Sequence, residues 1–442
     1  MIPGMTQTMK RLRGKESMKM RSFLLLLVMG LVLAVLAACG PDREEEAAPA
    51  PSEGETEGEV TEAEKPDTLT MWVNDEDAQL DAYEEITERF TEETGINVDI
   101  TPFSMLDQTD ALSLDAASGG GPDLFFQPND RMGDIYLQGL AAELELTEEQ
   151  LEGYPEGAIT ALSYEGAQLG IPAVIETYGL MYNTELVEEA PATIEELEQI
   201  AEELTNASAD EYGFLMEGTN FYYLYPFLEA YGGYVFNQDD NGVYDIEDIG
   251  LANEGAQEGA ELIQSWFEAG YLPQGITGDI MNGLFEDGKV GAVVTGPWNI
   301  PNYSAALGDN LAVAPLPSID GENMASFSGV KGWLVNEYSE NIEWATELAL
   351  FITNPENALT YFEVAGELPA RTDVEIDDEL RAGLVEQAEY AVPMPNIPAM
   401  SQVWDPMGDA FEFISQGQDA QEVLEEAVDQ IKEQIQLSEG AN

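Results

Sequence analysis

Short apolar runs alternate with amphipathic stretches in the part of the chain that follows residue 68. The run at 69–73, Leu-Thr-Met-Trp-Val, predicts a buried strand, and the next stretch has helical spacing. The residues on its apolar face are Leu80, Tyr83, Ile86, Thr87 and Phe90. Gly95 predicts the end of this helix. The further predicted elements are a strand at 96–100, a helix at 104–117, a turn at 119–123 and a strand at 124–126. Alternating strands and helices indicate an α/β fold with a parallel sheet.

The chain ends in a second clear amphipathic pattern. Its apolar positions are Ala420, Val423, Leu424, Ala427, Val428, Ile431 and Ile435. This spacing predicts a long helix with one buried face. The part of the chain from residue 68 onward has about 375 residues, which is more than one hydrophobic core normally serves, so we expect two lobes.

The first 38 residues have the pattern of an export signal. An apolar run at 23–38 follows Lys19 and Arg21 and ends in Leu-Ala-Ala-Cys, in which the cysteine is Cys39. Residues 1–38 therefore predict a secretory signal peptide. Its end resembles a bacterial lipobox, so we expect Cys39 to be lipidated. A transmembrane helix is the alternative, but the run has about 16 residues where about 20 are needed.

This signal predicts where the mature chain resides. We expect it on the extracellular face of the cell membrane, held by lipid, or in the periplasm if the cell is Gram-negative. Residues 39–67 are rich in Glu, Ala, Pro and Gly without apolar periodicity, which predicts a disordered tether. The long basic region leaves three alternative start positions, Met1, Met18 and Met20.

Acidic residues far outnumber basic ones, with 87 Asp and Glu against 15 Lys and Arg. Residues 1–38 hold six of the basic and one of the acidic residues, so the mature chain has nine basic and 86 acidic residues, a net charge of −77. This charge excludes nucleic acid and anionic membrane surfaces as partners, because both need a basic face. Salt must screen the self-repulsion, which indicates a salty habitat, with an alkaline habitat as the alternative.

The absence of histidine and the presence of a single cysteine restrict the catalytic groups, metal ligands and disulfides that are possible. The chain has no histidine, which excludes Ser-His-Asp and Cys-His catalysis and His-ligated zinc or iron sites. Cys39 is the only cysteine, so no intramolecular disulfide can form. The fold must therefore be stabilised by packing.

Several motifs resemble those of the extracellular solute-binding proteins of sugar importers, in the same order and spacing. Phe285-Glu-Asp-Gly-Lys289 and Gly296-Pro-Trp298 are broad motifs of this family. Asn129-Asp-Arg-Met-Gly133 and Met394-Pro-Asn-Ile-Pro398 are narrower and resemble the maltose/maltodextrin-binding branch. The other matching segments are 69–74, 121–126, 171–176, 179–183, 231–236 and Trp404. The resemblance runs from about residue 68 to 436.

The resemblance implies two α/β lobes that close on a ligand in the cleft between them, joined by several crossing strands. The first lobe would comprise 68–174 and 330–376, and the second 178–327 and 383–436. The implied function is a monomeric receptor without enzyme activity, cofactor or metal. It would capture maltose or a maltodextrin-type oligosaccharide and deliver it to the membrane subunits of an ABC transporter.

A sugar site needs aromatic rings for the C–H faces of the pyranose and polar groups for its hydroxyls. The resemblance implies that Trp298, Trp404 and Tyr222 stack on sugar rings. The other residues to which it gives ligand contacts are Asp130, Arg131, Glu176, Glu76 and Met394. Composition alone would make Trp298 a core residue and the adjacent Asp130 and Arg131 a surface pair.

Four positions depart from the maltose-binding pattern. Asp77 and Gly408 stand where a lysine and an arginine are usual, Gln127 replaces a tryptophan, and Asn220 replaces a glutamate. The retained aromatic residues favour a glucan-like ligand, while the altered polar positions keep galacto- or xylo-oligosaccharides as alternatives. A secreted glycoside hydrolase would need two carboxylates about 5–9.5 Å apart, and no pair in the sequence is singled out. A structural surface-layer role is less favoured, because no repeats occur.

One segment has the spacing of a calcium loop. The residues at its ligand positions are Asn237, Asp239, Asn241, Gly242, Asp245 and Asp248. The twelfth position is Asp instead of a bidentate Glu, and the first is Asn. A hairpin with an Asn241-Gly242 turn is therefore the favoured interpretation.

Overall fold

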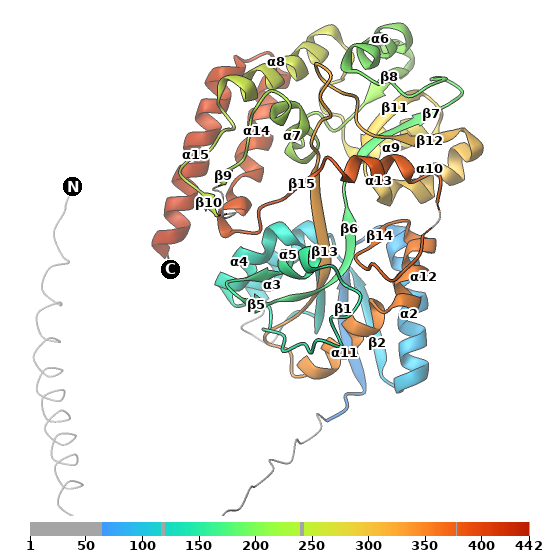
Figure 1. Cartoon of the computed structure of the whole chain (residues 1–442), viewed down its shortest axis with the longest axis vertical. Coiled ribbons are helices and arrows are strands. Elements are labelled where there is room, and N and C mark those ends of the chain that lie inside the picture. The colour runs from blue at the N-terminus through green and yellow to red at the C-terminus, as the bar shows by residue number, and fades with distance from the viewer. Residues whose placement is uncertain (1–63, 116–119, 239–242, 377, 442) are drawn as a thin grey trace, which may run out of the picture. The chain divides into compact units, whose positions relative to one another are not determined.

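The computed structural model describes residues 64–115, 120–238, 243–376 and 378–441 (Figure 1). The predicted signal peptide, Cys39 and most of the predicted tether lie outside these residues, as do Asp239, Asn241 and Gly242 of the calcium pattern. Contacts within the chain make 62–442 one compact unit. Within the described ranges, no helix has the length and apolar character needed to cross a membrane.

The first lobe is built on a mixed sheet. Among the described residues it has seven strands, in the order β14-β6-β13-β3-β1-β2, with β15 paired to β13. Their bounds are β1 Thr68–Val73, β2 Asn97–Pro102, β3 Leu124–Pro128, β6 Gly170–Glu176, β13 Phe327–Val335, β14 Leu368–Pro369 and β15 Val392–Pro393. β1 is parallel to β2 and β3, which confirms the predicted arrangement for the first three strands. The prediction is wrong for the sheet as a whole, because β13 runs antiparallel to β3 and β6.

Helices cover both faces of this sheet. The helices of the first lobe are α2 Asp77–Thr94, α3 Met105–Asp115, α4 Met132–Gln138, α5 Glu156–Ala161, α11 Ile342–Ile352 and α12 Pro355–Ala365. Alternate strand residues feed two separate cores, since Leu124 and Phe126 face one core and Phe125 faces the other. Each such fully buried side chain contributes about 1.5–3 kcal/mol. α2 ends at Gly95, where the sequence predicts it, with φ 74°.

The second lobe is built on a smaller sheet with the order β12-β7-β11-β8. These strands are β7 Gly179–Asn183, β8 Tyr212–Leu215, β11 Val290–Thr295 and β12 Leu311–Ala314. The helices around it are α6 Ile194–Leu204, α7 Phe221–Glu229, α8 Glu254–Ala269, α9 Gly278–Glu286, α10 Ile300–Leu307, α13 Ala382–Ala388, α14 Trp404–Ser415 and α15 Ala420–Ala441. All seven predicted apolar positions of α15 are buried, which confirms the C-terminal amphipathic helix.

Among the described residues, two small strand pairs lie outside these two sheets. β4 Ser163–Tyr164 pairs with β5 Ala167–Gln168 in the first lobe. β9 Asn237–Gln238 pairs antiparallel with β10 Tyr244–Asp245, as the hairpin interpretation of the calcium pattern requires.

β6 and β13 connect the two lobes and lie side by side (Figure 1). β6 ends at Glu176, and only Thr177 and Tyr178 separate it from β7 in the second sheet. The Thr177 hydroxyl donates to the Phe327 carbonyl at 2.9 Å, where β13 begins. A further passage leads from β14 to α13, and β15 then returns to pair with β13. β15 thus joins the first sheet, although the sequence places 383–436 in the second lobe.

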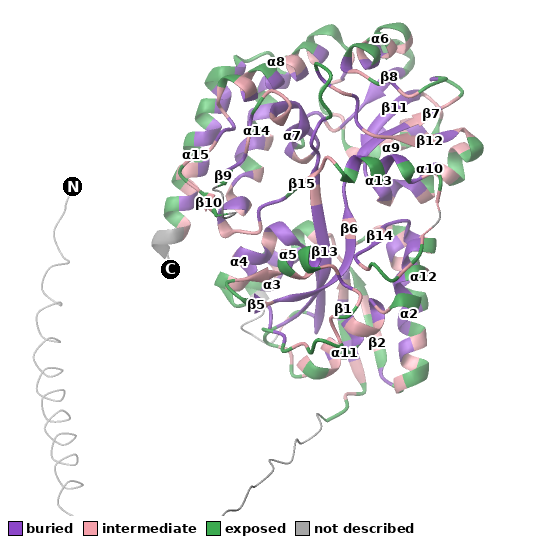
Figure 2. Cartoon of the chain, in the orientation of Figure 1, coloured by how far each residue is buried: buried purple, intermediate pink, exposed green. Residues whose placement is uncertain are grey.

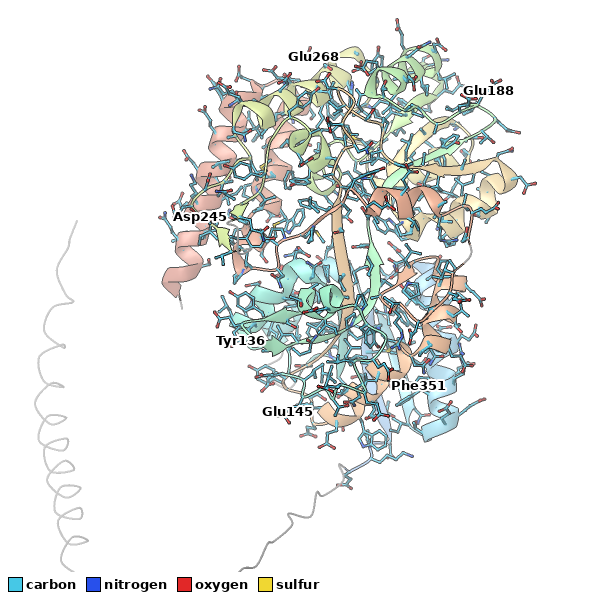
Figure 3. All side chains as sticks on the ribbon, viewed as in Figure 1. Tyr136, Glu145, Glu188, Asp245, Glu268 and Phe351 are labelled. Carbon is cyan, nitrogen blue, oxygen red and sulfur yellow. The ribbon has the colours of Figure 1, made fainter. Side chains whose placement is uncertain are left out.

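Buried residues follow the central strands of both sheets, whereas the edge strand β2 and the outward faces of the helices are exposed or half-buried (Figure 2). Acidic side chains lie on the periphery of both lobes, as Glu145, Glu188, Glu268 and Asp245 illustrate (Figure 3). The excess of negative charge is therefore spread over the surface.

Candidate functional site

A cleft of about 830 Å³ lies between the two lobes. The residues from the sequence prediction that line it are Glu76, Asp130, Arg131, Glu176, Asn220, Tyr222, Trp298, Met394 and Trp404. Residues far apart in the sequence and from both lobes thus converge on one cavity.

Three aromatic side chains of the second lobe form part of the wall. Trp298 lies in a short 3₁₀ turn, Pro297–Asn299, directly after β11. Gly296 lets the indole fold back, since a Cβ there would lie 2.1 Å from the Trp298 ring. Trp404 begins α14 and Tyr222 lies in the first turn of α7. All three rings are half-buried, unlike the core residue Trp266.

Asp130 connects the first lobe to this aromatic wall. It lies in the 3₁₀ turn Asn129–Arg131 that follows β3, and the residue is 4 % exposed. The Trp404 indole N–H donates to Asp130 Oδ2 at 3.0 Å, and Arg131 Nε lies 3.5 Å from the same oxygen. Burial raises the pKa of Asp130, while Arg131 and Trp404 oppose this effect. Asp130 is therefore a buried acceptor rather than part of an exposed surface pair.

The floor of the cleft holds a buried lysine among carboxylates. Lys331 lies in β13 beside a β-bulge, where the register with β6 shifts between Lys331 and Gly332. Its ammonium donates to Glu176 Oε2 at 2.8 Å and also to Glu367 Oε1. Burial lowers the pKa of Lys331, but these two carboxylates raise it by more, so its pKa lies above the ordinary value.

Glu76 joins this cluster through an amide. Gln79 Nε2 donates to Glu76 Oε2 at 2.8 Å and to Glu367 Oε2 at 3.1 Å. Burial and the nearby Glu367 raise the pKa of Glu76 to about 7. The cluster thus links two predicted ligand residues, Glu76 and Glu176.

The sequence prediction did not include Lys331, Glu367 or Glu217. A single lysine in the otherwise apolar segment 329–335 was the available signal for Lys331. Glu217 follows β8 and lines the cleft. Burial raises its pKa, while the Asn220 side chain and the Gly278 backbone N–H oppose this rise. No motif distinguished this carboxylate from the many others.

Of the four departures from the family pattern, Asn220 is the one that lines the cleft. Its side chain accepts from the Tyr222 backbone N–H at 3.1 Å and caps α7. Asp77 is exposed at the start of α2. Gln127 is buried, donates to the Met105 carbonyl and accepts from Thr109, so it fixes α3 against β3. Gly408 lies inside α14.

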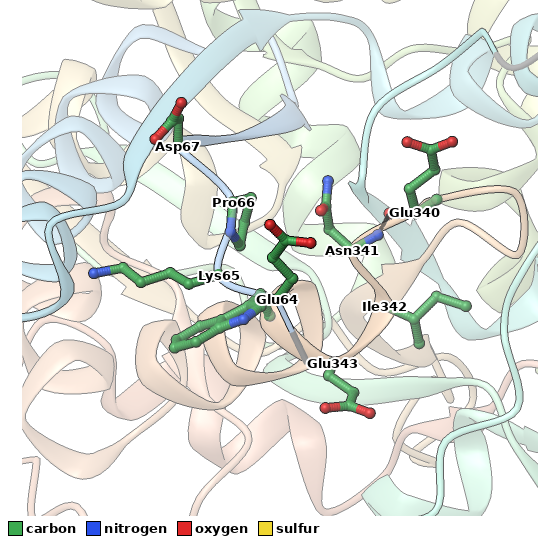
Figure 4. A pocket seen from close by; sticks show the side chains of 10 residues that line it. Glu64, Lys65, Pro66, Asp67, Glu340, Asn341, Ile342 and Glu343 are labelled. Carbon is green, nitrogen blue, oxygen red and sulfur yellow. Dashed lines mark hydrogen bonds between the residues drawn. The ribbon is translucent and has the colours of Figure 1, made fainter. Parts of the chain in front are cut away.

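A second hollow of about 660 Å³ lies where the chain enters β1 (Figure 4). It is lined by 64–67 and 339–344, and none of the predicted site residues belongs to it. Over the part of the chain that the structure describes, no group of three or more His, Cys, Asp or Glu residues is placed to hold a metal ion.

Comparisons with known proteins agree with this architecture. The family described as bacterial extracellular solute-binding protein matches residues 85–386. A galactooligosaccharide-binding protein of Bacillus subtilis (strain 168) is 32% identical over 413 residues, covering 90% of this chain and 94% of that protein. The maltodextrin-binding protein MdxE of Bacillus subtilis (strain 168) is 34% identical over 381 residues, covering 83% and 90%.

A solved structure is also similar to this chain. An extracellular solute-binding protein from Staphylococcus aureus, in complex with maltose, is 43% identical with a TM-score of 0.68. The match covers 84% of this chain and 99% of that one. The matched family, the relatives and the two-lobed fold together show that this chain belongs to the bacterial extracellular solute-binding proteins.

Proposed function

We propose that this protein is a receptor without enzyme activity that binds a maltose- or maltodextrin-type oligosaccharide and delivers it to an ABC transporter. The observation that carries the proposal is the convergence of Trp298, Trp404 and Tyr222 with Asp130 and Glu176 on one cleft. Half-buried rings can stack on the C–H faces of a sugar, and buried carboxylates can accept from its hydroxyls. The cleft volume of about 830 Å³ lies in the usual range for small-ligand sites.

The charge of the cleft supports a neutral ligand. Among the described residues that line it, ten are Asp or Glu, while Arg131 and Lys331 are the two cations. An anionic sugar would be repelled by this surplus of carboxylates. The maltose complex of the Staphylococcus aureus relative and the name of MdxE support a glucan.

A galacto-oligosaccharide is the second candidate. It is favoured by the name of the Bacillus subtilis relative and by Asn220, which takes the place of a glutamate on the cleft wall. An amide presents a donor as well as an acceptor, so this exchange alters which hydroxyl orientation is preferred.

Location and partners follow from the predicted signal. We propose that lipid on Cys39 holds a monomeric receptor at the extracellular face of the membrane, where both lobes contact the transporter. The lobes would correspond to 68–174 with 330–376 and to 178–327 with 383–436, apart from β15, which pairs with β13 in the first sheet.

A sugar titration tests the function. The soluble chain beginning at Gly40, which contains the compact unit 62–442, is titrated in molar salt while tryptophan emission is followed. We expect a saturable change with maltotriose whose midpoint moves to about 30-fold higher concentration in Trp298→Ala. A response to galacto-, xylo- or cello-oligosaccharides without one to maltotriose would move the specificity to another sugar. Sustained release of monosaccharide would contradict the receptor function.

A further inference from the structure

Lys331 occupies an unusual place for a lysine. It lies on β13, one of the strands that connect the lobes, and it is 3 % exposed at the floor of the cleft. Lysine is almost never fully buried unless it is paired. Its partners Glu176 and Glu367 are themselves 7 % and 0 % exposed. Water therefore has too little access to solvate their charges in place of the ammonium.

The partners of Lys331 extend to two of the carboxylates proposed to contact sugar, Glu176 and Glu76. Glu176 binds the ammonium directly at 2.8 Å. Glu367 binds the same ammonium and also accepts from the Gln79 amide, which holds Glu76. The Tyr361 hydroxyl donates to Glu367 as well. Lys331 is thus the one cation at the centre of this described network.

The ammonium also faces the second lobe. Lys331 Nζ lies 5.4 Å from the centroid of the Trp298 ring, within the range of a cation–π interaction. Lys331 therefore touches two parts of the proposed sugar site, namely the carboxylates of the first lobe and the stacking ring of the second.

Removing this cation would change the state of the carboxylates. Burial already raises the pKa of Glu176 and of Glu76, and the Lys331 ammonium opposes that rise, so its removal would favour their protonated forms. A protonated carboxyl keeps less acceptor capacity for sugar hydroxyls than a carboxylate does. The side chains would also lose the bonds that fix their orientation.

We propose that Lys331 is a positioning residue of the sugar site, which holds Glu176 and, through Glu367 and Gln79, Glu76 as oriented acceptors and places Trp298 against them. This inference rests on the proposed sugar-binding function and deepens it. Lys331 acts through its neighbours, so its loss should weaken binding although every group proposed to touch the sugar remains.

The test compares Lys331→Met with Lys331→Met/Glu367→Gln in maltotriose titrations. The single variant leaves the buried carboxylates without a positive partner and can fail to fold. The double variant removes the charge of residue 367 and keeps an amide oxygen there that can accept from Gln79. We expect the double variant to fold and to bind maltotriose about tenfold or more weakly at pH 7, because hydrogen bonds to charged groups act on that scale. Lys289→Met removes a half-exposed lysine outside the cleft and should bind as the wild type does.

The pH profile separates positioning from a purely structural role. Without the Lys331 ammonium, which lowers the pKa of Glu176, burial should raise that pKa further, so the carboxyl regains its charge only as the pH rises and the ratio of variant to wild-type Kd should fall with increasing pH. The other titratable groups that face Glu176 are Glu76, Glu367, Asp130, Tyr222 and Tyr223. A folded double variant with wild-type affinity, or a ratio constant with pH, overturns the proposal. A wild type that binds none of the oligosaccharides overturns the proposed function as well.

Discussion

Replacing Trp404 by phenylalanine should weaken maltotriose binding although an aromatic ring remains on the cleft wall. The change removes the indole N–H that donates to Asp130 at 3.0 Å. The bond joins the turn of the first lobe that carries Asp130 to the start of α14 in the second lobe, so it fixes the two side chains relative to one another on the cleft wall.

The expected loss of maltotriose affinity follows from the charge and burial of Asp130. Asp130 is a carboxylate that is 4 % exposed, so water has little access to replace the lost donor. A hydrogen bond to a charged group contributes about 1.5–3 kcal/mol, which corresponds to roughly 10- to 150-fold in Kd. The difference in Kd between Trp404→Phe and the wild type should be smaller at low pH. A protonated Asp130 is uncharged, so the hydrogen bond that it accepts from Trp404 is weaker.

Calorimetric titration with maltotriose in molar salt measures this effect. Trp344→Phe is the matched control, because the Trp344 indole nitrogen is buried without a hydrogen-bond partner among the described residues and Trp344 does not line the cleft. The control should bind as the wild type does. A Kd for Trp404→Phe within twofold of the wild-type value, with an unchanged melting temperature, would refute the reasoning.

Three further predictions follow from the structure. Trp298→Ala should lower maltotriose affinity by about 30-fold, the scale of a central aromatic contact, and an affinity equal to that of Trp344→Ala would contradict a stacking role. Glu76 has a folded pKa of about 7 against 4.5 for the ordinary value, so its stabilising contribution is complete below about pH 4.5 and is lost as the pH rises through 7. Its neighbours Glu367, Lys331, Glu176 and Asp75 remain in Glu76→Gln, whose melting temperature should therefore fall less between about pH 5 and 8 than that of the wild type. Melting temperature should also rise from low to molar salt as surface charges are screened, and equal values at both would count against this expectation.

The sequence predicted those parts of the fold that local periodicity determines. Three elements were recognisable from their own sequence, namely the strand at 69–73, the helix that ends at Gly95 and α15. In each of them the apolar residues recur at the spacing of the face that is buried. The direction of β13 was not recognisable. It follows from the path of a chain that leaves the first lobe by β6 and returns by β13, and no local pattern records that path.

The residues of the candidate site also differ in how far the sequence could predict them. Trp298 and Asp130 carry motifs, and the structure brings both to the cleft. Gln127 and Asp77 occupy motif positions but do not line it, since Gln127 turns inward to α3 and Asp77 faces solvent. Lys331 has no motif, and its role depends on Glu367, a residue 36 positions away that only folding brings into contact.

The paired passage of β6 and β13 has a mechanical consequence. Hydrogen bonds join the strands from Gly329 opposite Glu176 to Leu334 opposite Gly170, and Thr177 extends the connection to Phe327. A two-stranded ribbon bends easily perpendicular to the plane of its hydrogen bonds. It resists bending within that plane. The lobes should therefore swing about a single axis. A ligand too long for the cleft would then halt that swing early instead of tilting it, which makes the angle reached a measure of ligand length.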